Sequence, residues 1–367
     1  MAKTIEFRGM PCRRLGNSGL WVSEIGLGLW KWGYPEYDGS RVGEHLGFQI
    51  LDRALEMGVF HWDTANSYNA GSGNSERLLG QYFSRRPSIV RDQVMLATKV
   101  SNHHRQEHEL GSYPTNSTAF TPNQIGASRI YLMREVEHCL QKMQTDRIDL
   151  LYLHSANTWS GIGVGKTDWI TPLEETWSTM DDLITQGKVR YVAVSNHSAE
   201  QTRAVMEVMR QVGKDASRMI VAVENCYSLA ERGAVAADEA GDEQAFLDFC
   251  KETGLSIVPF FPLAGGLLTG RYTADNLDQV EGRLTTEGIG PRFLTEKGLK
   301  LAAEVARMAE KKGCSSAQLA IAWLLSHEQI GSVIAGVTKL EHLEDNGTAF
   351  NVELTAEELA ELDAISR

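Results

Sequence analysis

Short apolar runs rich in β-branched residues alternate with longer amphipathic stretches along the chain, and this alternation restricts the possible folds more than any other feature. Such alternation is typical of βα units, which build parallel sheets. Eight units favour one closed (β/α)₈ TIM barrel, an α/β fold, over an open doubly wound sheet. The strand-like runs lie near Ile25, at 59–63, 94–100, 148–154, 189–195, 219–224 and 255–260, and at 332–335.

The stretches between these runs carry the signals of helices. Apolar residues three and four positions apart form one stripe over 46–55 and another over 132–143, as in helices with one buried face. A capping residue followed three positions later by Glu or Gln marks a helix start. Such starts are predicted at Thr171 (with Pro172 in the first turn), Ser198, Ser315 and Thr355.

Turns and loops complete the expected architecture. Gly16-Asn17-Ser18-Gly19 lies between short extended runs, so residues 12–22 predict a β-hairpin that caps one end of the core. No linker rich in Pro, Gly or Ser divides the chain, so we expect a single barrel domain over residues 1–367. No G-x-G-x-x-G follows an early strand, which disfavours a Rossmann domain. The long loops after strands, where barrels carry function, are 101–127, 155–170, 226–241 and 263–294.

Composition excludes several classes of protein. With 48 acidic against 36 basic residues the net charge is −12, which disfavours nucleic acid and anionic membranes as partners. No apolar run approaches the ~20 residues of a membrane span, and no secretory signal precedes Arg14. The five scattered cysteines contain no C-x-x-C pair, so we expect a reducing, cytoplasmic setting without disulfides or zinc.

Three histidines in the first long loop are the one candidate metal site. His103, His104 and His108 have a spacing that suits a metal, but a polar surface loop explains them as well. We therefore predict no metal.

Polar residues close three successive apolar runs. Asp63, Lys99 and His154 stand at the predicted carboxyl ends of strands two, three and four, and Tyr68 follows in the loop after Asp63. Each residue alone is more readily explained structurally, as a turn former, a surface lysine, a core histidine or a packing tyrosine. Because neighbouring strand ends share one rim of a barrel, their joint placement favours a functional site.

These four residues suit the reduction of a carbonyl group. Asp63 can neutralise Lys99, and the ammonium can lower the pKa of Tyr68 from about 10 towards neutrality. Tyr68 can then donate a proton to a carbonyl oxygen, while His154 hydrogen-bonds the same oxygen. Such a site still requires a hydride donor beside it.

A series of ordered segments extends beyond these four residues. They are Asp63-Thr64-Ala65 with Tyr68, residues 73–80, Thr98-Lys99, Ile148-Asp149-Leu150 through His154, residues 187–191 through Ser195-Asn196, and residues 262–270. With these segments nearly the whole chain resembles the aldo-keto reductase family, close to the bacterial reductases that resemble channel β-subunits. The resemblance implies a (β/α)₈ barrel that moves hydride between a nicotinamide cofactor and an aldehyde or ketone. It also implies that Tyr68 is the general acid, that Lys99 and Asp63 tune it, and that His154 orients the substrate.

The cofactor contacts implied by the resemblance match less evenly. Ser195 and Asn196 correspond to the pair that holds the nicotinamide carboxamide, but Glu224 stands where the family usually has glutamine. A carboxylate accepts hydrogen bonds and donates none, so this contact changes. Phe260 replaces the tyrosine that stacks on the nicotinamide.

The resemblance places the phosphates of the cofactor on two further segments. The pyrophosphate segment contains Leu263, Gly265, Leu267, Gly270 and Arg271. In the adenosine segment, Gly336, Thr338 and Lys339 suit the 2′-phosphate of NADP(H), and Asn346 faces the adenine. Lysine in place of the frequent arginine leaves NAD(H) open.

We expect the substrate to be a small-molecule carbonyl compound or alcohol. The residues give little further information on its chemical class. Trp30, Trp32, Trp159 and Trp169 are candidates for a substrate wall, which suits a sugar or aryl carbonyl. Tryptophans also fill space under loops, so both interpretations stay open, as does a homo-oligomer.

Two functions other than carbonyl reduction are alternatives for this sequence. The first is a cofactor-binding regulatory subunit with little turnover, since the resemblance extends to channel β-subunits. About eleven residues precede the hairpin, which leaves little room for an inactivating arm, so we favour the enzyme. The second is a barrel hydrolase, which requires two acids or a metal at the rim, where Asp63 alone is clearly placed.

Overall fold

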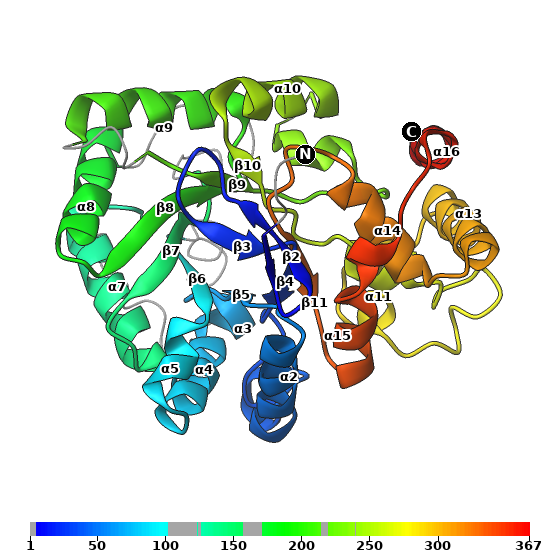
Figure 1. The fold of residues 1–367 in the computed structure, drawn as a ribbon, viewed down its shortest axis with the longest axis horizontal. Coiled ribbons are helices and arrows are strands. Elements are labelled where there is room, and N and C mark those ends of the chain that lie inside the picture. Colours follow the sequence, from blue (N-terminus) through cyan, green and yellow to red (C-terminus); the bar gives the residue numbers. More distant parts are fainter. Residues whose placement is uncertain (1–4, 102–122, 124–125, 157–170, 214–218, 239) are drawn as a thin grey trace.

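Eight parallel strands form the centre of the molecule (Figure 1). The computed structural model describes residues 5–101, 123, 126–156, 171–213, 219–238 and 240–367. Strands that are consecutive in the chain are neighbours in the sheet, and β11 pairs with β4. The strands are β4 (Ile25–Gly28), β5 (His61–Asp63), β6 (Met95–Val100), β7 (Ile148–Leu153), β8 (Val189–Ser195), β9 (Ala222–Glu224), β10 (Ser256–Ile257) and β11 (Val333–Gly336).

Backbone hydrogen bonds also join the two ends of this sheet. The Ile257 amide donates to the Gln329 carbonyl at 2.8 Å, and the Ile334 amide donates to the Pro259 carbonyl at 3.0 Å. The sheet therefore closes on itself as a (β/α)₈ barrel, which confirms the predicted fold class. All eight predicted strands are present, several of them shorter than their apolar runs.

Helices surround this barrel on the outside (Figure 1). They are α1 (Pro35–Asp38), α2 (Glu44–Glu56), α3 (Tyr68–Gly71), α4 (Asn74–Ser84), α5 (Ser88–Asp92), α7 (Arg129–Met143), α8 (Leu173–Thr185), α9 (Ala199–Val212), α10 (Glu243–Thr253), α11 (Arg283–Thr286), α12 (Gly290–Phe293), α13 (Glu296–Lys312), α14 (Ser316–Leu325), α15 (Leu340–Asn346) and α16 (Ala356–Ser366), with 3₁₀ turns η3 (Gly233–Ala236), η4 (Ala264–Thr269) and η5 (Ala349–Asn351). The capping boxes predicted at Ser198, Ser315 and Thr355 are confirmed.

The predicted cap at Thr171 is wrong. Helix α8 begins at Leu173 with Pro172 as its N-cap residue, and no side chain caps it. The Thr171 hydroxyl instead accepts a hydrogen bond from the Ala127 amide at 3.3 Å. The threonine thus holds the start of a neighbouring segment, a tertiary contact that a local pattern does not reveal.

The predicted hairpin is confirmed and covers one end of the barrel (Figure 1). Strands β2 (Met10–Arg14) and β3 (Trp21–Ser23) pair antiparallel, and an unpredicted strand β1 (Ile5–Phe7) joins them. Leu15 and Val22 are fully buried and pack with the apolar residues inside the barrel. At Gly16, with φ of 59°, a Cβ atom would lie 2.4 Å from the Val221 carbonyl oxygen, so glycine is required for this close approach.

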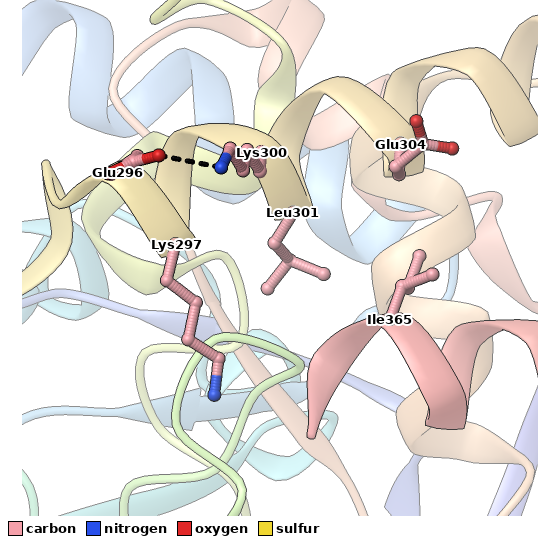
Figure 2. Close-up of a pocket in the computed structure, with 6 residues that line it drawn as sticks. All are labelled: Glu296, Lys297, Lys300, Leu301, Glu304 and Ile365. Atoms are coloured by element: carbon pink, nitrogen blue, oxygen red, sulfur yellow. Dashed lines mark hydrogen bonds and ion pairs between the residues drawn. The ribbon is translucent and has the colours of Figure 1, made fainter.

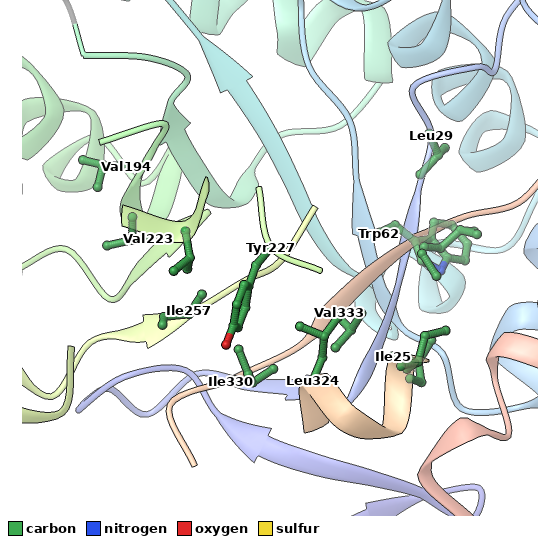
Figure 3. Packing of buried hydrophobic residues seen from close by; sticks show 14 of the residues in the cluster. Ile25, Leu29, Trp62, Val194, Val223, Tyr227, Ile257, Leu324, Ile330 and Val333 are labelled. Atoms are coloured by element: carbon green, nitrogen blue, oxygen red, sulfur yellow. The ribbon is translucent and has the colours of Figure 1, made fainter. Parts of the chain in front are cut away.

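Besides the apolar residues inside the barrel, a second layer of apolar side chains lies between the strands and the helices (Figure 3). On β5 the side chains alternate, because successive residues of a strand point to opposite faces. Trp62 points outward and contacts Tyr82 and Phe83, with ring centroids 5.6 and 6.0 Å away. His61 and Asp63 therefore point into the barrel, two residues apart and nearer to opposite ends.

Candidate active site

Asp63, Lys99 and Tyr68 form a hydrogen-bonded cluster at the carboxyl ends of β5 and β6. Both carboxylate oxygens of Asp63 accept from the Lys99 ammonium. Lys99 Nζ also donates to the Tyr68 hydroxyl at 3.0 Å and to the Thr64 carbonyl at 3.1 Å. The Tyr68 hydroxyl in turn donates to Asp63 Oδ2 at 3.1 Å. The phenol is thus held between a cation and an anion.

Burial and neighbouring charges together set the pKa values of this cluster. Asp63 and Lys99 are each 1% exposed. Burial acts to lower the pKa of Lys99, but the negative charges of Asp63 and Glu224 outweigh it and raise that pKa, which keeps the ammonium charged.

The expected lowering of the Tyr68 pKa is wrong. Burial and the adjacent Asp63 carboxylate raise the pKa of Tyr68 by more than the Lys99 charge lowers it. The main reason is burial, which disfavours a charged phenolate, and the negative charge of Asp63 adds to it. Tyr68 therefore keeps its proton at neutral pH.

His154 follows the last residue of β7 and lies beside this cluster. Its ring centroid is 6.1 Å from that of Tyr68 in an edge-to-face arrangement. Its Nδ1 is 3.3 Å from the Ser67 hydroxyl, and its carbonyl accepts from Asn196 Nδ2 at 2.9 Å. Because β5, β6 and β7 are neighbours in the sheet, three positions distant in the sequence meet at one rim.

The residues after β8 and at the end of β9 border the same cluster. Ser195 Oγ donates to the Glu224 carbonyl at 2.9 Å, and Asn196 Nδ2 donates to Ser195 Oγ at 3.0 Å. Glu224 is 1% exposed, and its Oε1 lies 3.3 Å from Lys99 Nζ. Ser195, Asn196 and Glu224 are thus brought together as expected for one edge of a ligand site.

Glycines in the left-handed region of φ shape the segment after β10. Gly265 and Gly266 have φ values of 68° and 104°, and Gly270 has 76°. Leu267 is fully buried and anchors the segment, while Leu263 packs on the core from a half-buried position. Positive φ at consecutive glycines favours an anion-binding concavity of backbone N–H groups.

Three basic side chains lie near one another at the end of this loop. Burial lowers the pKa of the His342 imidazole, and the positive charges of Lys339 and Arg271 lower it further. Thr338 Oγ1 lies 3.4 Å from His342 Nδ1. Gly336 has open space where a Cβ would stand, and Asn346 is buried on the following helix α15. His342 was missed in the sequence because it belongs to no motif.

These features fit a nicotinamide dinucleotide. The glycine turn and the basic side chains suit its phosphates, and Glu224 Oε2 is a buried oxygen that accepts no hydrogen bond from any residue the structure describes. Phe260 lies next to Phe261 at the carboxyl side of β10, with ring centroids 5.7 Å apart. The Phe260 ring therefore lies at the same end of the barrel as Asp63, Lys99 and Tyr68.

An aromatic wall stands beside Tyr68. The Trp30 ring lies 6.2 Å from that of Tyr68 and 5.5 Å from that of Phe261. The Arg283 guanidinium packs 4.3 Å from the Trp30 ring centroid and 4.7 Å from the Phe261 centroid. Arg283 was not expected, since no pattern in the long loop 263–294 distinguishes it from the other basic residues.

Trp32 does not belong to this wall. It is fully buried, and its indole N–H donates to the Val337 carbonyl at 2.9 Å, so it offers no surface to a substrate. Its position beside Trp30 in the sequence suggested a shared role, but tertiary packing turns it into the core. Trp159 and Trp169 lie outside the described residues.

Other places in the structure give less evidence of a functional site. A shallow groove between α13 and α16 is lined by Lys297, Leu301 and Ile365 among others (Figure 2), but it lies between surface helices, away from the strand ends. Within the described ranges no group of three or more His, Cys, Asp or Glu side chains is placed to hold a metal. His103, His104 and His108 lie outside those ranges. No helix in the described part of the chain is long and apolar enough to cross a membrane.

Comparison with known proteins agrees with the fold and the site. The sequence profile of the aldo/keto reductase family matches residues 24–367. The chain is 29% identical to the L-glyceraldehyde 3-phosphate reductase of Escherichia coli (strain K12), over 99% of this chain and 94% of the relative. It is 26% identical to the versiconal hemiacetal acetate reductase of Aspergillus parasiticus, over 96% of both chains.

A third relative is the uncharacterized oxidoreductase YrpG of Bacillus subtilis (strain 168), which is 30% identical over 96% of this chain and 94% of the relative. A barrel with a polar cluster at its carboxyl rim, a nearly complete family match and reductase relatives agree with one another. The chain belongs to the aldo/keto reductase family, and it is an oxidoreductase of carbonyl compounds that uses a nicotinamide cofactor.

Proposed function

We propose that residues 1–367 form one catalytic domain that uses NADP(H) to reduce an aldehyde or ketone, or to oxidise the corresponding alcohol, with Tyr68 as general acid. The observation that carries the proposal is the Tyr68 hydroxyl, which donates to Asp63 and accepts from Lys99. In this position Tyr68 holds a proton that it can donate, and Lys99 can stabilise the negative charge that develops on the phenolic oxygen.

The proton transfer follows from this geometry. Rotation about the phenolic C–O bond turns the Tyr68 proton from Asp63 towards a substrate oxygen, while Lys99 continues to donate to the phenolic oxygen. As the O–H bond breaks and the proton joins the substrate, the Lys99 ammonium stabilises the phenolate. Asp63 fixes the lysine, and His154 hydrogen-bonds the substrate oxygen.

The nicotinamide supplies the hydride when bound, and this chain's residues hold and orient it. Ser195, Asn196 and Glu224 border the space for its carboxamide, and Phe260 offers a ring face for stacking. The glycine turn of residues 263–270 suits the pyrophosphate. Thr338 and Lys339, with Arg271 nearby, favour a 2′-phosphate and therefore NADP(H) over NAD(H).

The substrate class follows from the wall beside Tyr68. Trp30 provides an apolar face, and Arg283 provides a cation that is stacked between two rings. An aryl or sugar carbonyl suits the face of Trp30, and a phosphorylated aldehyde, such as the one in the name of the Escherichia coli relative, suits Arg283.

The test is turnover with matched tyrosine variants. Purified protein is mixed with NADPH or NADH and a panel of aryl aldehydes, sugars and glyceraldehyde 3-phosphate, and nicotinamide absorbance is followed. We expect Tyr68→Phe to lower kcat by about 10³-fold with unchanged NADPH affinity. The matched control is Tyr82→Phe, since that hydroxyl bonds Asp52 outside the barrel.

Two outcomes would contradict the proposal. Equal activity of Tyr68→Phe and wild type would remove Tyr68 as the acid. Tight cofactor binding without turnover of any carbonyl would instead favour the cofactor-binding regulatory subunit.

A further inference from the structure

Glu224 places a second buried carboxyl group against Lys99. It is the last residue of β9 and is 1% exposed, with Oε1 3.3 Å from Lys99 Nζ. Its Oε2 is buried and accepts no hydrogen bond from the residues that the structure describes. The Tyr152 hydroxyl, also inside the barrel, lacks a partner within the same residues. Glu224 therefore lies among polar groups that leave half of its carboxyl group unsatisfied.

The Lys99 ammonium has closer oxygen partners than Glu224. An ammonium carries three N–H groups, and Lys99 already directs hydrogen bonds to Asp63, to the Thr64 carbonyl at 3.1 Å and to the Tyr68 hydroxyl at 3.0 Å. Both Asp63 oxygens accept, so Glu224 Oε1 is the fifth oxygen neighbour of Lys99 Nζ, at the longest distance of the five. With both acids ionised, the buried site would hold two negative charges against one positive charge, which is costly away from water.

A proton on one of the two acids relieves this cost, and geometry selects Glu224. Both oxygens of Asp63 accept from Lys99, and one also accepts from Tyr68, so its charged form is well stabilised. Glu224 has only the 3.3 Å contact. Burial, followed by the charge of Asp63, raises the pKa of Glu224 to about 8, against the opposing effect of Lys99.

Resting on the function proposed above, we propose that Glu224 is a positioning residue that acts as a neutral carboxylic acid, and that its ionisation slows carbonyl reduction through Lys99. The charged and titratable groups that face it are Lys99 on β6, Asp63 on β5, Tyr68 on α3 and Tyr152 on β7.

The neutral and ionised forms act differently on the proton donor. A neutral acid has one O–H donor and an accepting oxygen, like the amide of a glutamine, and leaves the Lys99 hydrogen bond to Tyr68 intact. Ionised Glu224 competes for the ammonium and adds a negative charge that raises the pKa of Tyr68. A phenol that is a weaker acid, with less help from Lys99, donates its proton more slowly.

The kinetic test compares pH profiles. The reduction rate of an accepted carbonyl by NADPH is measured from pH 6 to pH 10 for wild type, for Glu224→Gln and for the matched control Glu231→Gln. We expect kcat of wild type and of the control to fall about tenfold or more as the pH rises past about 8. Glu224→Gln, which retains a neutral donor and acceptor, should show no such fall. Identical profiles for wild type and Glu224→Gln would overturn the proposal.

A second measurement requires neither cofactor nor substrate. Infrared difference spectra between wild type and Glu224→Gln should contain a protonated carboxylic acid band at pH 6 that disappears by pH 10. Absence of this band at pH 6 would overturn the proposal even if the enzyme is active. Its presence in a protein without turnover would leave the protonation of Glu224 supported and the proposed function refuted, so the two failures are distinguishable.

Discussion

The two ends of the barrel interior differ in what their inward-facing residues do. At the end covered by the hairpin, Leu15 and Val22 pack with apolar side chains, and His61, the titratable residue that β5 places nearer this end, is buried beside Ser332. Burial lowers the pKa of His61 to about 3, helped by the charge of Lys99, so it is neutral. At the opposite end the Asp63–Lys99 ion pair keeps charge inside the protein.

This difference shows that two residues of the three-residue strand β5 have different roles, one in stability and one in the proposed chemistry. His61 and Asp63 point the same way from β5, yet one is kept neutral and the other is ion-paired. Neutral packing lowers the free energy of the fold, whereas buried charge is retained although it costs desolvation. The comparison predicts that changes at the hairpin end alter stability alone, and that changes at the rim alter activity first.

The largest effect is expected from Lys99→Met. It leaves Asp63 as an uncompensated buried carboxylate, so we expect a loss of about 3–5 kcal/mol in the free energy of unfolding and a fall in kcat of about 10³-fold or more. Urea unfolding and steady-state kinetics measure the two. The double variant Asp63→Asn with Lys99→Met should regain stability without regaining activity; recovery of both would break the contrast between the two ends.

Leu15→Ala tests the hairpin end. Removing this fully buried side chain leaves a cavity inside the barrel, with an expected cost of about 2–5 kcal/mol in the free energy of unfolding. At a temperature well below the melting transition, kcat should stay within twofold of wild type. A loss of kcat comparable to that of Lys99→Met would mean that the two ends are coupled.

The pH dependence of stability sharpens the comparison for Glu224. Its pKa in the folded protein is about 8 against 4.5 for an ordinary glutamate side chain, so the folded state binds one proton more between these values. This contribution to stability is fully present below pH 4.5, is lost as the pH rises, and is absent above pH 8. Relative to Glu224→Gln, wild type should lose up to about 1.4 kcal/mol per pH unit in that window. Parallel stability curves for the two proteins would contradict it.

The smallest effect is expected at the outer edge of the rim. Lys339 contributes to the positive charge around His342, and Lys339→Ala should raise the KM for NADPH about tenfold, the equivalent of one charge-assisted contact, with little change for NADH. Stability should change by less than about 1 kcal/mol because exposed charges contribute little. Lys311→Ala, a change in the last turn of α13, is the control. An equal rise for both cofactors would remove Lys339 as the 2′-phosphate ligand.

Much of the architecture follows from local pattern. Runs of β-branched residues and amphipathic stripes have periods of 2 and 3.6 that depend on backbone geometry alone, so the eight strands, the hairpin and three of the four capping boxes were predictable. The rim positions of Asp63, Lys99 and His154 were also predictable, because parallel strands in sequential order bring their carboxyl ends together.

The features that depend on the tertiary structure are electrostatic and steric. Local sequence could not tell that burial and the Asp63 charge raise the pKa of Tyr68 by more than Lys99 lowers it, that Trp32 turns into the core beside Trp30, or that Arg283 stacks between two rings. Nor could it tell that Glu224 lies against a lysine whose ammonium has closer oxygen partners. Each of these depends on distances of a few ångströms between strands and loops far apart in the chain, and neither the Coulomb energy nor the desolvation of a group is defined until those distances are fixed.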